Sequence, residues 1–517
     1  MNARDRFRSI LKSAAASVAA LFACLSPLAA QEVTITSAQG GLSVTGRIVS
    51  YDGQYMRVES DYGPLTVDYS TVQCSGAACP DPAQYVPRLR ISGEARATEI
   101  LLPALLDGFA RQADLTAQQI VTDDMLSGIM LLDAQNAPVL DVPVLPSNSA
   151  EAFADLVTFR ADAALSFREI LDVENQRAAD VGLADLRGLG HAFILGIDAL
   201  VPIVSPLNPQ RRIDPGLLDA AFTGVVTAWP DGTPLSLHLG PELDGQADAF
   251  LASLPGDAAS LTRHRDAAAL SAAVAEDVGA LGVTALSETG VAQAVSLVDT
   301  CGLVSAPRIS SIKTQDYPLT TPLFLTLAQQ RQPQIVLDFL GYLRSPEAHL
   351  IIRRAGLVDL GVVPIPLDGQ GGRLAHAITI AGVDTPLTEL QRMVQLMHAR
   401  ARSSLTFRFD VGTATLDPVS NANLLTLAHD IRAGLYDGRD ILLIGFSDGE
   451  GPALANLELS GERAKRVRDR LLDVLGDDLP ETVQIDTAAF GEALPIGCDD
   501  TARGRQANRR VEVWIGD

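Results

Sequence analysis

Two residues of opposite charge near the C-terminus, Asp448 and Arg463, have the types and spacing of a small receptor site. The apolar run 441–444 predicts a strand covered on both faces, and Asp448 follows its end. We expect Arg463 in the first turn of a helix that opens at Ser460, where unpaired backbone N–H groups favour an anion. An arginine can bind a carboxylate through two N–H groups, while an aspartate accepts a hydrogen bond from an amine. The pair therefore predicts a receptor for a zwitterion, or else an ion pair that ties the loop to the helix.

The segments that must position this pair predict an α+β domain over residues 404–517, preceded by a helical linker over 386–403. One helix would begin with Asp417 as its N-cap and Pro418 at its first position, and the other with Ser460. The expected strands lie at 405–409, 441–444, 483–487 and 511–515, where apolar residues alternate or run together. The element order is therefore βαβαβ(α)β.

This domain carries two motifs that resemble the OmpA-like C-terminal domain: Asn456-x-x-Leu459-Ser460-x-x-Arg463-Ala464 and Gly504-Arg505-x-x-Asn508-Arg509-Arg510-Val511-Glu512. The resemblance implies non-covalent binding of peptidoglycan through its diaminopimelate residue. In that reading Asp448 holds the amine, Arg463 holds the carboxylate, and Asn456 orders the approach to the helix. The resemblance assigns Arg505, Asn508 and Arg509 to local structure, with direct ligand contact as the alternative.

The turn that contains Asp448 also matches two other patterns. Gly445-Phe446-Ser447-Asp448 departs from the Gly-His-Thr-Asp that is usual in the OmpA-like domain, but it keeps the acid. With Gly449 it also fits G-x-S-x-G, the pattern of a hydrolase nucleophile elbow. That site needs a later histidine as base, and none follows His429 in the sequence. No other triad, metal cluster or phosphate loop is evident, so we expect no enzyme activity, no metal and no cofactor.

Residues 88–385 alternate strand-like and helix-like stretches, which predicts an α/β domain. Several blocks resemble the phosphate-type solute-binding proteins of ABC transporters: 161–168, 197–204, 222–229 and 337–358. The resemblance implies a two-lobed periplasmic binding fold. It covers some 280 residues, each block being of moderate specificity.

The ligand of this middle domain is open. Receptors for phosphate hold it with backbone N–H groups and hydroxyls at helix starts, but the matching turns here contain Glu94 and Asp244. A carboxylate disfavours an oxyanion there unless Arg96 or Arg168 compensates. The plausible donors are Ser92, Ser149, Ser166 and Arg168. The domain would bind a small ligand, such as an anion, or a protein partner; alternatively, it is a structural spacer or a phosphate-type receptor.

The first thirty residues predict a secretory signal peptide, with four basic residues, an apolar run and cleavage after Ala30. Cys24 lies in an imperfect lipobox, so lipidation is an alternative. A small β domain is expected over 31–87, with short strands at 33–35, 42–44, 47–49, 56–58 and 65–67. The chain is therefore a multidomain protein of α/β and α+β type.

Charge and cysteine content define the compartment and the partners. The net charge of −23 becomes −26 without the signal, which carries four basic and one acidic residue, and no basic patch predicts nucleic-acid binding. Cys74 and Cys79 are expected to form a disulfide in an oxidising compartment. Cys301 and Cys498 either pair across domains or stay buried thiols; their spacing does not decide between the two, and we slightly favour buried thiols. We expect a periplasmic, peptidoglycan-associated protein of a Gram-negative envelope, with outer-membrane association as an option.

Overall fold

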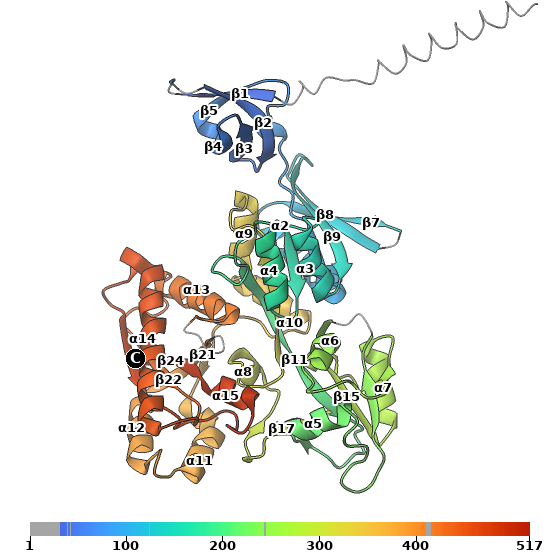
Figure 1. Cartoon of the computed structure of the whole chain (residues 1–517), viewed down its shortest axis with the longest axis vertical. Helices are drawn as coiled ribbons and strands as arrows, with labels where there is room; N and C mark the ends of the chain where they lie inside the picture. Colours follow the sequence, from blue (N-terminus) through green and yellow to red (C-terminus); the bar gives the residue numbers. More distant parts are fainter. Residues whose placement is uncertain are drawn as a thin grey trace, which may run out of the picture. The chain divides into compact units, whose positions relative to one another are not determined.

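The fold is taken from a computed structural model (Figure 1) that describes residues 32–38, 40–41, 43–123, 125–241, 245–409 and 415–516. The predicted signal peptide over 1–30 and Cys24 lie outside these residues. The chain divides into two units: one holds the residues up to Pro87 with Gln332–Ile335, and the other holds the rest.

The N-terminal unit contains an antiparallel sheet in the order β4-β3-β2-β1-β5. Its strands are β1 (Glu32–Ser37), β2 (Ser43–Tyr51), β3 (Tyr55–Ser60), β4 (Gly63–Asp68) and β5 (Val72–Ser75). The two short strands expected at 42–44 and 47–49 are one strand, β2, and β5 was not predicted. The expected Cys74–Cys79 disulfide is present. It lies at the end of β5 and staples a sheet too small to bury a large core.

The middle domain consists of two α/β lobes, which Figure 1 shows above and below the long strand β11 (Ala192–Val204). In the first lobe β10 pairs in parallel with β6, and β6 with β9. In the second lobe β13 pairs in parallel with β14 and β15. β11 pairs with β19 over residues 192–199 and with β15 over residues 200–204, so one strand crosses both lobes. The two-lobed α/β architecture expected from the sequence is therefore present.

The elements of the middle domain have the following bounds. The strands of the first lobe and the crossing strand β19 are β6 (Ile91–Glu94), β7 (Thr116–Thr122), β8 (Met125–Leu132), β9 (Pro138–Ser147), β10 (Ala163–Ser166) and β19 (Thr320–Leu327). Those of the second lobe are β12 (Arg212–Ile213), β13 (Ser236–Leu239), β14 (Thr262–Arg263), β15 (Ala280–Ala285), β16 (Gln293–Ala294), β17 (Ser296–Val298) and β18 (Val304–Ser305). The helices are α2 (Leu102–Gln112), α3 (Ser149–Val157), α4 (Asp172–Asp180), α5 (Pro215–Phe222), α6 (Gly245–Ala252), α7 (Ala267–Glu276), α8 (Ile309–Lys313), α9 (Gln334–Tyr342) and α10 (Pro346–Arg354).

The C-terminal domain contains a sheet in the order β20-β21-β24-β22-β23, in which only β22 and β23 among these paired strands run parallel. Its strands are β20 (Pro364–Ile365), β21 (Arg400–Arg408), β22 (Asp440–Phe446), β23 (Gln484–Ala489) and β24 (Arg510–Gly516). Its helices are α11 (Gly371–Ile380), α12 (Leu387–Met397), α13 (Pro418–Arg432), α14 (Ala453–Leu475) and α15 (Ala502–Asn508). From β21 onward the order is the predicted βαβαβ(α)β.

The two faces of this sheet have separate cores. One face packs against α13 and α14 through residues such as Leu424, Leu427 and Val467. The other packs against α11 and α12, where Leu390 and Met393 meet β22. The segment predicted as a linker is therefore different in the structure: α12 covers the sheet, and β21 already begins at Arg400. This double cover explains why run 441–444 is continuously apolar.

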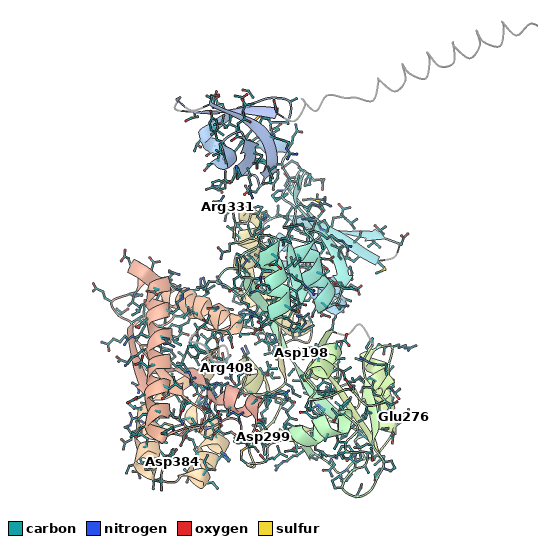
Figure 2. The ribbon with its side chains drawn as sticks, in the orientation of Figure 1. Asp198, Glu276, Asp299, Arg331, Asp384 and Arg408 are labelled. Carbon is teal, nitrogen blue, oxygen red and sulfur yellow. A yellow bond between two sulfur atoms is a disulfide. The ribbon has the colours of Figure 1, made fainter. Side chains whose placement is uncertain are left out.

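The middle and C-terminal domains are joined covalently and by buried charges. Cys301 and Cys498 form a disulfide, so the slight preference for free thiols was wrong. They lie 197 residues apart, and no spacing rule could reveal the contact. Arg402 on β21 donates to both oxygens of Asp316, at 2.6 and 3.1 Å, after α8. Arg408, labelled in Figure 2, donates to a main-chain carbonyl oxygen of the same segment, that of Gln315, at 2.9 Å.

Among the residues that the structure describes, no helix is long and apolar enough to span a membrane.

Candidate functional site

The two charged residues predicted to form the site, Asp448 and Arg463, lie near the carboxyl end of β22. β22 ends at Phe446, and Asp448 follows two residues later. Arg463 comes from α14, which packs directly on the strand: a Cβ built on Gly445 would lie 1.9 Å from the main-chain oxygen of Ser460. Only glycine permits this approach of helix to strand. The close packing brings Arg463 toward the loop that contains Asp448.

Helix α14 begins earlier than predicted. It opens at Ala453 after Pro452, and Ser460 lies inside it. Arg463 is therefore not in the first turn, and the helix start does not contribute to its neighbourhood as expected. Asn456, predicted to order a loop, is itself helical and 4 % exposed.

Asp448 and Arg463 do not form the ion pair that the sequence offered as the alternative to a receptor site. Asp448 accepts from Nη1 of Arg509 at 2.7 Å, whereas Arg463 has no such bond to it. Arg463 is 9 % exposed, and its Nη1 has no hydrogen-bond partner among the described residues. Its guanidinium lies 5.8 Å from the ring centre of Phe409. The simple alternative, an Asp448–Arg463 ion pair tying loop to helix, is therefore not what the structure contains.

Two guanidinium groups, those of Arg463 and Arg509, interact with the charge of Asp448. Burial lowers the pKa of Arg463, the nearby charge of Arg509 lowers it further, and Asp448 acts in the opposite direction. A guanidinium nevertheless stays protonated in proteins. Both cations interact with Asp448, and Nη1 of Arg463 has no hydrogen-bond partner in the part of the chain that the structure describes. A guanidinium donor of this kind is the type of group that binds a carboxylate.

A further acid near the site was not singled out from the sequence. Glu492 accepts from Nδ2 of Asn456 at 3.2 Å. Burial raises the pKa of Glu492, and the charges of Asp384, Asp499 and Asp448 raise it further. It follows β23 in a loop with no motif, so no sequence signal identified it. Glu492 is therefore a second carboxylate, besides Asp448, in this region.

The tail motif mainly supports the loop beside the site. Asn508 is 1 % exposed, and its Oδ1 accepts from the N–H groups of Ile496 and Gly497 at 2.8 and 3.1 Å. Arg505 donates to the main-chain oxygen of Asp499 at 2.6 Å. Arg509 differs, because it contacts Asp448 directly. The tail motif therefore positions the site and supplies one of its charges.

Ser447, the serine of the elbow-like pattern, is 3 % exposed, and its Oγ has no hydrogen-bond partner within the described part of the chain. A nucleophilic serine must reach solvent and bond to a base. The geometry gives Ser447 neither.

The four candidate donors of the middle domain are all engaged within the protein. Ser92 donates to Asp155 at 2.8 Å, and Ser149 donates to Glu94 at 2.5 Å. Arg168 pairs through both Nη atoms with Glu174, at 2.8 and 2.7 Å. Ser166 bonds to the main chain of Arg168, two residues away. Asp244 lies outside the described residues.

Comparisons with known proteins indicate the class of the C-terminal domain. Residues 408–509 match the model of the OmpA family, so this region is an OmpA-family domain. Relatives include an outer membrane porin F of Pseudomonas aeruginosa, 32 % identical over 114 residues, which are 22 % of this chain and 31 % of the relative. The probable lipoprotein YiaD of Escherichia coli is 34 % identical over 21 % of this chain and 46 % of its own length. The peptidoglycan-binding protein ArfA of Mycobacterium tuberculosis is 35 % identical over 20 % and 29 %. The chain spans less than half the length of these three relatives.

Solved structures are similar to both large domains. An ABC-type phosphate transport receptor from Vibrio cholerae matches with a TM-score of 0.40 and 17 % identity, over 52 % of this chain and 99 % of that one. The peptidoglycan-associated lipoprotein of Burkholderia pseudomallei matches with a TM-score of 0.19 and 24 % identity, over 21 % and 88 %.

Proposed function

We propose that the C-terminal domain binds peptidoglycan non-covalently, through the zwitterionic end of diaminopimelate. The observation that carries the proposal is the buried Arg463, whose Nη1 has no hydrogen-bond partner among the described residues, beside the Asp448–Arg509 ion pair. The match to the OmpA family and the names of the relatives support the same ligand class.

The proposed recognition uses one charge for each end of the ligand. The ligand carboxylate accepts a hydrogen bond from Nη1 of Arg463, the donor atom that has no partner among the described residues. The ligand amine donates to Asp448, which stays oriented by Arg509. Each hydrogen bond to a charged group contributes about 1.5–3 kcal/mol, so losing one has a measurable effect. Asn456 acts through Glu492, since it contacts that acid.

The protein would act in the cell envelope as a non-enzymatic anchor that uses no cofactor. Its middle domain is fixed to the anchor through Cys301–Cys498 and through Asp316 with Arg402. Because a disulfide and a buried ion pair join the two domains, the anchor would hold the middle domain at a fixed orientation near the peptidoglycan.

Co-sedimentation of the mature chain with purified diaminopimelate-type sacculi tests this function. We expect the wild type to co-sediment and Asp448→Ala to lose most binding, because the ligand amine loses its acceptor. Glu450→Ala is the matched control, since Glu450 lies in the same loop and its side chain is 76 % exposed. Equal binding of Asp448→Ala and wild type would place the ligand elsewhere.

A further inference from the structure

Glu94 in the middle domain is a buried carboxylate at the end of a strand. It is the last residue of β6 and is 5 % exposed. Oε1 of Glu94 accepts from Oγ of Ser149 at 2.5 Å, and Ser149 is the first residue of α3. Burial of a charged carboxylate is costly unless donors or positive charge compensate for lost water. The start of a helix supplies both, because its first N–H groups have no partner in the helix.

The same carboxylate reaches the start of a second helix, in the other lobe. Gly245 is the first residue of α6, and a Cβ built there would lie 1.9 Å from Oε1 and 2.7 Å from Oε2 of Glu94. The carboxylate therefore lies directly against the backbone of Gly245. A larger residue at this position would force the Glu94 carboxylate to shift, so a substitution of Gly245 perturbs the contact between the lobes.

A second bridge crosses the lobes beside this contact. Arg96, two residues after Glu94, donates through Nη2 to Oγ of Ser287 at 3.0 Å. Its Nη1 lies 3.2 Å from Glu288 and 3.7 Å from Asp198. Figure 2 labels Asp198 between the lobes, where β11 crosses. Glu94 and Arg96 therefore both connect the first lobe to the second.

We propose that Glu94 is the built-in anion of the middle domain. Its carboxylate occupies a site formed by the starts of α3 and α6, and it holds the two lobes together without a bound solute. The site is selective for a small carboxylate or oxyanion, and it becomes available to an external one only when the Glu94 side chain is removed. This inference does not depend on peptidoglycan binding, which uses other residues of another domain.

Chemical rescue of Glu94→Ala in the full mature chain tests the proposal. We expect the variant to unfold at a lower temperature, by roughly 5 °C for a contact of this size in a domain of this length. Formate, acetate or phosphate would then restore at least half of the loss in a saturable manner, because an anion that binds only the folded state stabilises it. Sodium chloride at equal ionic strength would not. The wild type would not respond to the three anions beyond the chloride control.

Small-angle scattering measures whether the two lobes move apart. Glu94→Ala should have a larger radius of gyration than the wild type, and formate should return it to the wild-type value. Glu99→Ala is the matched control, because Glu99 is an exposed carboxylate five residues along the chain. Saturable sub-millimolar binding of formate or phosphate to the wild type would overturn the proposal. So would a Glu94→Ala variant that keeps wild-type scattering and ignores all three anions.

A second variant keeps the test decisive if Glu94→Ala folds poorly. Gly245→Ala attacks the same contact from the other lobe, because its Cβ would occupy the place of Oε1. We expect the loss caused by Gly245→Ala to be smaller in a Glu94→Gly background than in the wild type, since residues in contact are not additive. If Gly245→Ala destabilised both backgrounds equally, Glu94 and Gly245 would not be coupled, and the proposed contact would be contradicted.

Discussion

Arg463→Ala is expected to reduce the affinity of the mature chain for diaminopimelate-type peptidoglycan roughly 10- to 100-fold, the loss of one charge-assisted contact of about 1.5–3 kcal/mol. The reason is the unused Nη1 of a buried guanidinium, which a ligand carboxylate would engage. The affinity is measured by co-sedimentation with a concentration series of sacculi. Arg463→Lys should recover only part of the loss, because an ammonium lacks the planar fork that binds a carboxylate twice.

Lys465→Ala is the control for that experiment. Lys465 lies on the same helix, but its side chain is 55 % exposed and pairs with Glu462. Its removal changes the net charge by the same amount and should leave the affinity unchanged. If Lys465→Ala weakened binding as much as Arg463→Ala, general charge rather than the site would hold the ligand.

Asp316→Asn is expected to lower the free energy of unfolding by about 3–5 kcal/mol at neutral pH, the usual cost of removing one partner of a buried ion pair. Burial alone would raise the pKa of Asp316, but the charges of Arg402, Arg373 and Arg408 outweigh it and lower the pKa to about 2. The variant leaves Arg402 without the two bonds it makes across the domains. Denaturant titration gives the difference.

The effect should depend on pH with a defined sign. The folded pKa of Asp316 lies below the value of about 3.9 that an unfolded aspartate has, so the unfolded state binds protons first. The stabilisation by Asp316 is complete above about pH 5 and is lost as the pH falls toward 2. The gap between wild type and Asp316→Asn should therefore shrink over that window. Glu462→Gln removes one partner of an exposed ion pair with Lys465. It should lower the free energy of unfolding by less than about 1 kcal/mol at every pH. A pH-independent gap for Asp316→Asn would contradict this account.

The local order of the C-terminal domain could be predicted because it rests on short-range signals. Asp417 as N-cap, Pro418 at the first position and the apolar run 441–444 each fix one element. The start of α14 was missed by seven residues, since the buried residue of its first two turns is the polar Asn456, while Leu454 and Leu459 are exposed. Residues 453–459 are mostly good helix formers after Pro452, which in hindsight favours the earlier start.

Contacts between distant segments could not be predicted. Arg509 is 61 residues from Asp448, and only the sheet brings the end of α15 beside the end of β22. The same limit applies to Cys301 with Cys498, and to α12, which covers a sheet face instead of linking two domains. For the middle domain, the sequence identified Glu94 as unsuited to an anion site. The structure adds its partners, Ser149 and Gly245, which turn that mismatch into a contact between lobes.

We propose above that Asp448 binds the amine and Arg463 the carboxylate of diaminopimelate. Calorimetric titration of the mature chain with two soluble muropeptides tests it most directly, one with diaminopimelate and one with lysine in its place. Lysine keeps the amine but lacks the second carboxylate, so Arg463 would lose its partner. We expect the diaminopimelate form to bind at least about tenfold more tightly, equivalent to about 1.4 kcal/mol. Equal affinity for the two muropeptides would contradict the claim.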